Sequence, residues 1–287
     1  MTTRLLHHRG ELRAALAGRS GGDEVGVVMT MGALHDGHRE LIRVARRRCQ
    51  VIVVTVFLNP LQFAPGEDLS RYPRTLDSDV ALCDAEAVDI VFAPDVAEVY
   101  PLGEQPQVRI DAGPLGDVLE GASRPGHFDG VLTVVAKLLH MTGPDVAYFG
   151  QKDAQQLLLI RRMTQDLDFP VEVVAVPTVR DGDGLALSSR NGYLSDEDRD
   201  AALTLSRALH AGVGAALSGP EAVRRAASTV LQDQPGVGVD YLALVDPSTL
   251  HDVPADFTGT ALLAVAADVG PTRLIDNMVL DLRRVQP

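Results

Sequence analysis

The order of apolar and polar positions predicts alternating strands and helices over roughly the first 180 residues. Continuous apolar runs rich in β-branched residues, typical of parallel strands buried on both faces, occur at 25–30, 51–57, 88–94, 146–150 and 171–180. Segments with helical apolar spacing precede or separate them at 10–17, 38–48, 75–86, 131–142 and 151–167. This alternation implies right-handed crossovers and an α/β fold with a Rossmann-like, doubly wound parallel sheet.

The pattern changes after Tyr193. A capping box at 195–198 begins an alanine-rich helix that extends to about residue 211, and Pro220 begins a second helix over 220–232. Three strand-like runs follow at 237–246, 260–269 and 273–280. We therefore expect two domains, a Rossmann-like domain in residues 1–180 and a smaller C-terminal α+β domain in 181–287. The loop 181–191 would lie at their junction, where ligand clefts are common.

Composition narrows the functional classes. The net charge is −13, and the longest basic run is the three arginines at 46–48, near the end of a predicted helix. A nucleic-acid partner is therefore not expected, although a local pocket for a small anion stays open. The two cysteines form no disulfide framework or zinc motif, and neither a signal-peptide core nor a membrane-length apolar run is found. We expect a soluble protein of a reducing compartment, without a membrane partner.

The first candidate site follows the strand 25–30. Gly32 ends the strand-like run, and His35 and His38 stand at the start of the next helix. A helix N-terminus offers unpaired N–H groups to a phosphate, and two imidazoles there could donate hydrogen bonds as charge builds up in a transition state. Two surface histidines beside a tight turn would give the same HxxH spacing, so the spacing alone leaves both interpretations open.

Three further loops carry polar groups that a core does not need. Gln62 follows the strand 51–57 and suits a ligand with hydroxyl and carboxylate groups, although an ordinary loop glutamine would look alike. Lys152 stands at a helix start, where a cation is unfavourable unless an anion or Asp153 accompanies it. A Gly-rich segment contains Ser188, Ser189 and Arg190, which resemble a phosphate clamp but also fit a plain surface loop.

These segments together resemble one family. MTMGALHDGH, FLNPLQF, RYPRT, GHFDGVLTVVAKLL, YFGQKDAQQ and LSSRN, in this order across residues 29–191, with RLIDN at 273–277, are similar to the pantothenate synthetases, or pantoate–β-alanine ligases. The histidine turn alone indicates only the wider nucleotidylyltransferase superfamily with its HxGH motif. The combination with the other motifs is what makes the resemblance specific.

The resemblance implies an ATP-dependent ligase that condenses pantoate with β-alanine through a pantoyl-adenylate and releases AMP and pyrophosphate. It also implies Mg²⁺, a cytoplasmic homodimer and a place in coenzyme A biosynthesis. His35 and His38 would act on the α-phosphate, Gly150, Lys152 and Asp153 on the nucleotide, and Ser188, Ser189 and Arg190 on the triphosphate. Met31, Gln62 and Gln156 would line the pantoate pocket, Asp79 is the metal candidate, and Arg124 and His127 are further candidates.

Three residues depart from the commoner family pattern. Met29 replaces a proline, Gln151 a frequent acidic residue and Leu187 a frequent methionine, and the last two flank the nucleotide region. Two other functional classes are alternatives: a nucleotidylyltransferase that releases an adenylylated product, and a non-catalytic nucleotide-binding module. The glutamines and the FLNPLQF loop disfavour the first, and the intact His35, His38, Lys152 and Arg190 disfavour the second.

Overall fold

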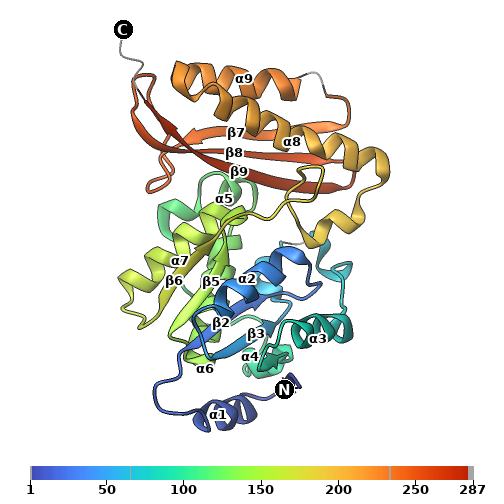
Figure 1. The fold of residues 1–287 in the computed structure, drawn as a ribbon, viewed down its shortest axis with the longest axis vertical. Helices are drawn as coiled ribbons and strands as arrows, with labels where there is room; N and C mark the ends of the chain where they lie inside the picture. Colours follow the sequence, from blue (N-terminus) through green and yellow to red (C-terminus); the bar gives the residue numbers. More distant parts are fainter. Residues whose placement is uncertain (1, 65, 233, 284–287) are drawn as a thin grey trace. The chain divides into compact units, whose positions relative to one another are not determined.

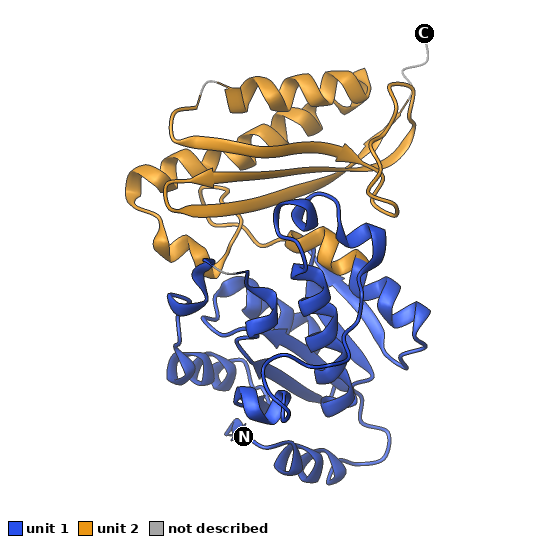
Figure 2. Cartoon of the chain, turned by 180° about the vertical axis from the view of Figure 1, so that it is seen from behind, with its two compact units in different colours: residues 1–151, 159–177 blue, residues 152–158, 178–287 orange. Residues whose placement is uncertain are grey.

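The computed structural model describes residues 2–64, 66–232 and 234–283, and the chain divides into two compact units (Figure 2). The first unit comprises residues 1–151 and 159–177, and the second comprises 152–158 and 178–287. The sequence predicted a single division near residue 180. The second unit in fact takes in a short segment directly after the fifth strand of the chain as well.

The first unit is built on a six-stranded, all-parallel sheet in the order β1-β4-β3-β2-β5-β6 (Figure 1). Its strands are β1 (Arg4–Leu6), β2 (Val25–Thr30), β3 (Val51–Val56), β4 (Ile90–Phe92), β5 (Val146–Gly150) and β6 (Glu172–Val176). Its helices are α1 (Arg9–Ala17), α2 (Asp36–Arg46), α3 (Leu76–Ala85), α4 (Val96–Val99), α5 (Glu120–Ser123) and α6 (His127–Thr142). Helix α7 (Ala154–Asp166) has residues in both units.

The sheet order places a topological switch point between β2 and β5. The chain runs from β2 through β3 to β4 in one direction, then returns to pair β5 with the other edge of β2. In doubly wound sheets, ligands bind beyond the carboxyl ends of the strands at this point. The His35 turn follows β2 and Gly150 ends β5, so both sequence motifs belong to the two strands that flank the switch point.

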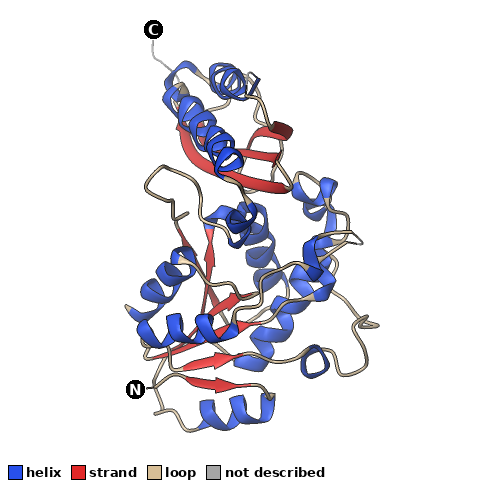
Figure 3. Cartoon of the chain, turned by 90° about the vertical axis from the view of Figure 1, so that its right-hand side faces the viewer, coloured by secondary structure: helices blue, strands red, loops and turns tan. Residues whose placement is uncertain are grey.

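Helices cover both faces of this sheet (Figure 3). On one face, α2 and α3 bury Leu41, Ile42 and Cys83 against the strands in a single apolar cluster. Cys49 and Cys83 are both free and buried, which confirms the prediction that they are core residues. The arginine run 46–48 spans the C-terminal end of α2 and pairs with surface carboxylates; Arg48, just beyond the helix, pairs with Glu24 and Glu172.

The second unit contains a three-stranded antiparallel sheet in the order β7-β8-β9. Its strands are β7 (Val237–Val245), β8 (Gly259–Val269) and β9 (Thr272–Leu282), and helices α8 (Asp196–Gly214) and α9 (Pro220–Gln232) pack on one face of them (Figures 1 and 3). Ser195 accepts a hydrogen bond from the Asp198 N–H, which is the predicted capping box. The predicted fold class is therefore confirmed: a doubly wound parallel sheet and a smaller α+β unit. No helix in the described residues has the length and apolarity needed to cross a bilayer.

Candidate functional site

The turn between β2 and α2 has an unusual backbone. Gly32 has φ +90° and Ala33 has φ +52°, so two successive residues adopt the left-handed region before the helix begins. His35 is the N-cap of α2 and His38 lies in its first turn, as the sequence predicted. This left-handed pair of residues turns the chain sharply between strand and helix. Both histidines therefore lie just beyond the carboxyl end of β2.

Backbone hydrogen bonds determine the tautomers of these histidines. Nδ1 of His35 accepts the Gly37 N–H at 3.1 Å, and Nδ1 of His38 accepts the His35 N–H at 3.3 Å. Because an accepting Nδ1 carries no hydrogen, each neutral ring carries its hydrogen on Nε2. The rings are neighbours, with centroids 4.2 Å apart. The turn thus holds two imidazoles that present the same donor nitrogen.

The protonation state of His38 is also set by its surroundings. Burial, with a smaller contribution from the neighbouring His35, lowers the pKa of His38 from 6.5 to about 3. His38 is therefore neutral at physiological pH. It can donate one hydrogen bond from Nε2, and it does not bring a positive charge to a ligand.

Asp79 supports this turn from helix α3. Its side chain is only 2% exposed, and its two carboxylate oxygens accept the backbone N–H groups of Ala33 at 3.1 Å and Leu34 at 2.8 Å. Thr75 donates a further hydrogen bond to Oδ1 at 3.2 Å. A buried carboxylate that is satisfied by backbone donors stabilises the left-handed turn. Asp79 therefore holds in place the segment that leads directly into His35.

Asn59 organises the loop that carries Gln62. It is fully buried, and its Nδ2 donates to Gln62 Oε1 at 3.0 Å and to the Gly130 carbonyl at 3.1 Å. Its Oδ1 accepts from the Tyr100 hydroxyl at 2.8 Å and the Leu61 N–H at 3.4 Å. Burial raises the pKa of Tyr100, so this hydroxyl stays protonated and donates. All four hydrogen-bonding positions of the Asn59 amide are used.

This network also orients the amide of Gln62. Because Oε1 accepts from Asn59, the Nε2 group points its hydrogens elsewhere, and no acceptor for them occurs among the described residues of the chain. Gln62 is half-buried. It therefore presents an oriented N–H donor, which suits a carboxylate or hydroxyl oxygen.

Arg124 and His127 bind the backbone of the same loop. The Gln62 carbonyl accepts from Arg124 Nη2 at 3.1 Å and from His127 Nδ1 at 2.8 Å. The Arg124 guanidinium also forms a bidentate pair with Glu67, at 2.8 and 2.7 Å. The two candidates that the sequence singled out here thus position Gln62, together with Glu67.

Helix α6 approaches this loop at Gly130. A Cβ at Gly130 would lie 2.2 Å from the Leu61 carbonyl oxygen, far inside van der Waals contact. Only glycine allows the backbone of the loop to come this close to the helix. The Gly130 carbonyl is also one of the two acceptors of Asn59.

The second unit contains Lys152 and the loop 181–191. The Lys152 carbonyl accepts the Asn277 Nδ2–H at 2.7 Å, whereas no ion pair joins Lys152 to Asp153 within the described part of the chain. In the loop, the Ser188 hydroxyl oxygen accepts the Arg190 N–H at 3.3 Å and so caps the short 3₁₀ helix Ser189–Tyr193. Asp153 is exposed, while Lys152 and Gln156 are half-buried.

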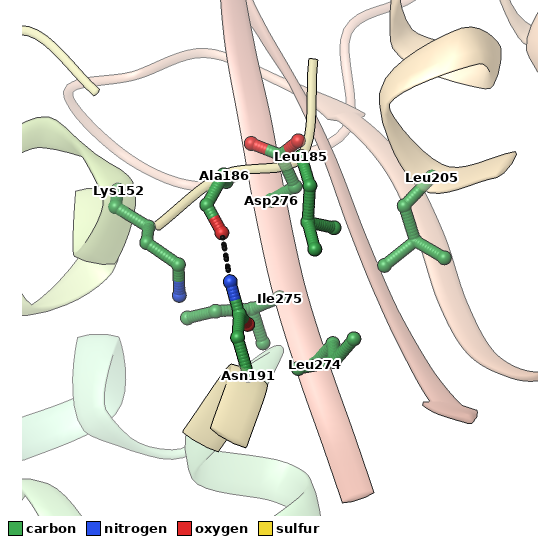
Figure 4. A pocket seen from close by; sticks show the side chains of 8 residues that line it. All are labelled: Lys152, Leu185, Ala186, Asn191, Leu205, Leu274, Ile275 and Asp276. Atoms are coloured by element: carbon green, nitrogen blue, oxygen red, sulfur yellow. Dashed lines mark hydrogen bonds between the residues drawn. The ribbon is translucent and has the colours of Figure 1, made fainter. Parts of the chain in front are cut away.

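A small pocket of the second unit brings Lys152 next to this loop (Figure 4). The pocket is lined by Lys152, Leu185, Ala186, Asn191, Leu205, Leu274, Ile275 and Asp276. Asn191 Nδ2 donates to the Ala186 carbonyl at 3.0 Å, and its buried Oδ1 has no hydrogen-bond partner in the described residues. The hydrogen bond between Asn191 and Ala186 therefore links two parts of this loop next to Lys152.

Comparison with known proteins agrees with the motifs. The family model described as pantoate-beta-alanine ligase matches residues 4–279. The chain is 54% identical to the pantothenate synthetase of Streptomyces avermitilis, with 98% of each chain covered, and 57% identical to that of Salinispora arenicola, again with 98% of each covered. The chain belongs to the pantoate–β-alanine ligase family.

Solved structures of the pantoate–β-alanine ligase family share the fold. The crystal structure of pantothenate synthetase from Thermus thermophilus is 50% identical, with a TM-score of 0.91 over 96% of this chain and 99% of that one. The ligase from Francisella tularensis, complexed with beta-gamma ATP and beta-alanine, is 32% identical, with a TM-score of 0.80 over 96% and 97%. Both confirm the resemblance on which the sequence assignments rest.

Within this family framework, the contacts distinguish the sequence-predicted residues. The first unit contains Met31, His35, His38, Gln62, Asp79, Arg124, His127 and Gly150, and the second contains Lys152, Asp153, Gln156, Ser188, Ser189 and Arg190. The roles given to them remain predictions. The sequence motifs alone assigned no function to Asn59, Glu67 or Asn277. Asn59 was visible only as part of the FLNPLQF motif, and its partners Tyr100 and Gly130 are distant in sequence.

The metal assignment receives no support from these contacts. Asp79 is buried and both of its oxygens already accept backbone hydrogen bonds, so it fits a structural carboxylate better than a Mg²⁺ ligand. No group of three or more metal-ligating side chains occurs in the residues that the structure describes. A Mg²⁺ ion that arrives with a nucleotide would take most of its ligands from phosphate and water.

Proposed function

We propose that this chain condenses pantoate with β-alanine in two steps, with ATP as the activating substrate. In the first step a pantoate carboxylate oxygen attacks the α-phosphorus of ATP, which forms pantoyl-adenylate and releases pyrophosphate. In the second step the amine of β-alanine attacks the acyl carbon, so that AMP leaves with the bonding electron pair and the amine loses a proton. Family membership and the geometry of the histidine turn support this proposal.

The observation that carries the proposal is the pair of tautomer-fixed histidines at the switch point. Attack on the α-phosphorus increases the charge on the non-bridging oxygens, and fixed N–H donors stabilise that charge without reorganising. His35 and His38 each carry the hydrogen on Nε2, and the neutral His38 needs no proton transfer to act. Their role is therefore donation to the α-phosphate.

The oriented amide of Gln62 supports pantoate binding at the carboxyl ends of the strands. Its Nε2 donor would bind a pantoate oxygen, while Asn59 prevents the amide from rotating. By family resemblance, Met31 and Gln156 are further candidates for binding pantoate. A carboxylate held in this way keeps one oxygen in position for in-line attack, which is where positioning accelerates such a reaction.

Lys152 and the loop 181–191 would bind the nucleotide phosphates. Lysine and arginine are the usual cationic partners of phosphate, and Arg190 adds a planar set of donors beside the hydroxyls of Ser188 and Ser189. Gly150 and Asp153 belong to the same nucleotide-binding turn by their motif. In the absence of a protein nucleophile, these residues act by position and charge alone.

Three further parts of the proposal rest on family resemblance. The nucleotide enters as its Mg²⁺ complex, the enzyme is a homodimer, and it acts in the cytoplasm in coenzyme A biosynthesis. The two buried free thiols agree with a reducing compartment. Sedimentation equilibrium tests the dimer, and titration of activity with Mg²⁺ at fixed ATP tests the metal requirement.

The deciding experiment is pantoate-dependent exchange of labelled pyrophosphate into ATP, with Mg²⁺ present and β-alanine absent. We expect exchange only when pantoate is added, because only then does a reversible adenylate form. Adding β-alanine should then release AMP and pantothenate in equal amounts. Folded protein that binds ATP but gives no exchange with pantoate would refute the proposal.

A further inference from the structure

The RLIDN segment on strand β9 has contacts that the reaction scheme has not used. It ends with Asp276 and Asn277, which are 4% and 8% exposed and are therefore buried polar side chains. On an edge strand of a small antiparallel sheet, such residues are costly unless they are hydrogen-bonded. Both make contacts with parts of the second unit that carry predicted nucleotide-binding residues.

Asp276 holds the start of the loop 181–191. Its carboxylate accepts from Arg180 Nη1 at 2.6 Å and Nη2 at 2.9 Å, a bidentate pair that is almost fully buried on the carboxylate side. Arg180 Nη1 also donates to the Gly184 carbonyl at 3.1 Å. The pair therefore closes the base of the loop, where Arg180 also forms a β-bridge with Ala186.

Asn277 holds the segment that contains Lys152. Its Nδ2 donates to the Lys152 carbonyl at 2.7 Å across 125 positions of sequence. The Asn277 N–H in turn donates to Asp276 Oδ1 at 2.8 Å. Two adjacent residues of one strand thus fix two separate segments.

Both segments contribute to one pocket. Lys152, Ala186, Asn191 and Asp276 all line it, and Figure 4 shows the lysine side chain extending toward the loop residue Asn191. The lysine stem is flexible but of fixed length, so the region that the Lys152 ammonium group can reach is set by where its backbone is held. The spacing between Lys152 and the Ser188–Arg190 segment is consequently set through β9.

We propose that Asp276 and Asn277 are positioning residues for the nucleotide phosphates: they fix the Lys152 backbone and the base of the loop 181–191 in one arrangement. This inference rests on the proposed function, since it assumes that Lys152 and the Ser188–Arg190 segment bind the same triphosphate. It assigns to the RLIDN motif a role in adenylation that sequence resemblance alone did not provide.

The test compares Asn277→Ala with Asp281→Asn in the full-length protein. Asn277→Ala removes the hydrogen bond to Lys152 but leaves the Arg180–Asp276 pair intact. Asp281 lies on the same strand, is exposed and accepts from the Thr260 hydroxyl at 3.0 Å, so its variant is the matched control. Pyrophosphate exchange gives KM for ATP, KM for pantoate and kcat for each protein, and calorimetry gives Tm.

For Asn277→Ala we expect kcat for exchange to fall about tenfold and KM for ATP to rise about tenfold, since a displacement near 1 Å in a positioning contact has large effects on rate. KM for pantoate and Tm should stay close to the values of the control. Unchanged ATP kinetics would overturn the inference, and so would a uniform loss explained by a lower Tm. If the unmodified protein shows no exchange at all, the proposed function fails instead.

A second variant addresses the ion pair. Asp276→Asn retains the size of the side chain but loses its charge. Removing one partner of a buried pair destabilises a fold. The activity of this variant is therefore measured only on its folded fraction. Arg180→Lys keeps the charge and loses the bidentate geometry. We expect both to raise KM for ATP, and both to leave KM for pantoate unchanged; a pantoate effect of equal size would contradict the positioning role.

Discussion

The role of His38 can be separated into its two nitrogens by two substitutions. Nδ1 accepts the backbone N–H of His35 and helps to cap helix α2, whereas Nε2 carries the hydrogen assigned to the α-phosphate. Asparagine places an acceptor near the position of Nδ1 but has nothing at Nε2. Glutamine places an N–H near Nε2 but loses the capping acceptor. His38→Asn and His38→Gln therefore remove different functions of one ring.

The expected magnitudes differ accordingly. Removing a single fixed donor to a developing oxyanion costs about 10²–10³ in rate, which is roughly 3–4 kcal/mol, so His38→Asn should lose that much exchange activity while remaining folded. Losing a helix cap costs about 0.5–2 kcal/mol of stability. His38→Gln should therefore be less stable than His38→Asn and yet more active.

The variant His38→Asn, compared with the unsubstituted protein, also tests whether His38 is neutral in the folded state. Its pKa is lowered from 6.5 to about 3 on folding, so between these values the unfolded chain binds the proton and the folded chain does not. The free energy of unfolding must then fall as pH falls through 6.5, and the contribution of His38 to this loss is about 2 kcal/mol at pH 5. His38→Asn should lack this part of the acid destabilisation.

The assays are pyrophosphate exchange at saturating substrates and urea unfolding at pH 7 and pH 5. The change in unfolding free energy between pH 7 and pH 5 is compared between the unsubstituted protein and His38→Asn. In this difference the contributions of the other titrating groups cancel. Exchange by His38→Asn within threefold of the unsubstituted protein would refute the donor role. If the unsubstituted protein and His38→Asn lose the same unfolding free energy between pH 7 and pH 5, His38 is not held neutral by the fold.

Three other substitutions test the contacts around the site. Asp79→Asn should lower exchange at least tenfold, because one backbone N–H of the turn loses its acceptor at about 1–3 kcal/mol; its Mg²⁺ requirement should not change, and a raised requirement would restore the metal role. Gly130→Ala forces a Cβ against the Leu61 carbonyl, so KM for pantoate should rise and Tm should fall, whereas Gly10→Ala, in open space, should do neither. Gln62→Glu keeps the acceptor for Asn59 but puts an anion where the donor was; KM for pantoate should rise about 10- to 100-fold, and an equal rise in KM for ATP would reverse the pocket assignment.

Local pattern sufficed to predict most elements because strands buried on both faces and capped helices leave local signals. Strand β5 matches the predicted run 146–150 in full, and α9 matches 220–232. The limits that differ have local causes. Strand β6 ends at Val176 rather than 180 because Pro177 cannot donate to the ladder. Helix α2 begins at Asp36 rather than residue 38 because His35 is already its cap. Strand β1 was not predicted, since only Leu6 of its three residues is buried.

The site could be predicted only as far as its motifs are local. The His35/His38 turn shows itself through a strand end, a glycine and a helix start within ten residues. The contacts that orient it do not, because Asp79 bonds to backbone groups 45 and 46 positions away. The family resemblance made Asp79 a candidate near the metal. In the structure its two carboxylate oxygens instead accept hydrogen bonds from the backbone of the turn.

The same separation holds throughout the proposed site. Gln62 is oriented by Asn59, its backbone by Arg124 and His127, and the Lys152 backbone by Asn277. Gln62 and the Lys152 backbone are thus held by residues that would not themselves touch a substrate, and these contacts join segments up to 125 positions apart in sequence. A reaction with no protein nucleophile depends on such fixed donors, because a rate gained from position is lost when the donor can move. A module that only bound a nucleotide would have no need of two histidines fixed in the same neutral tautomer. The supporting residues are therefore where substitutions should most sharply separate loss of activity from loss of fold.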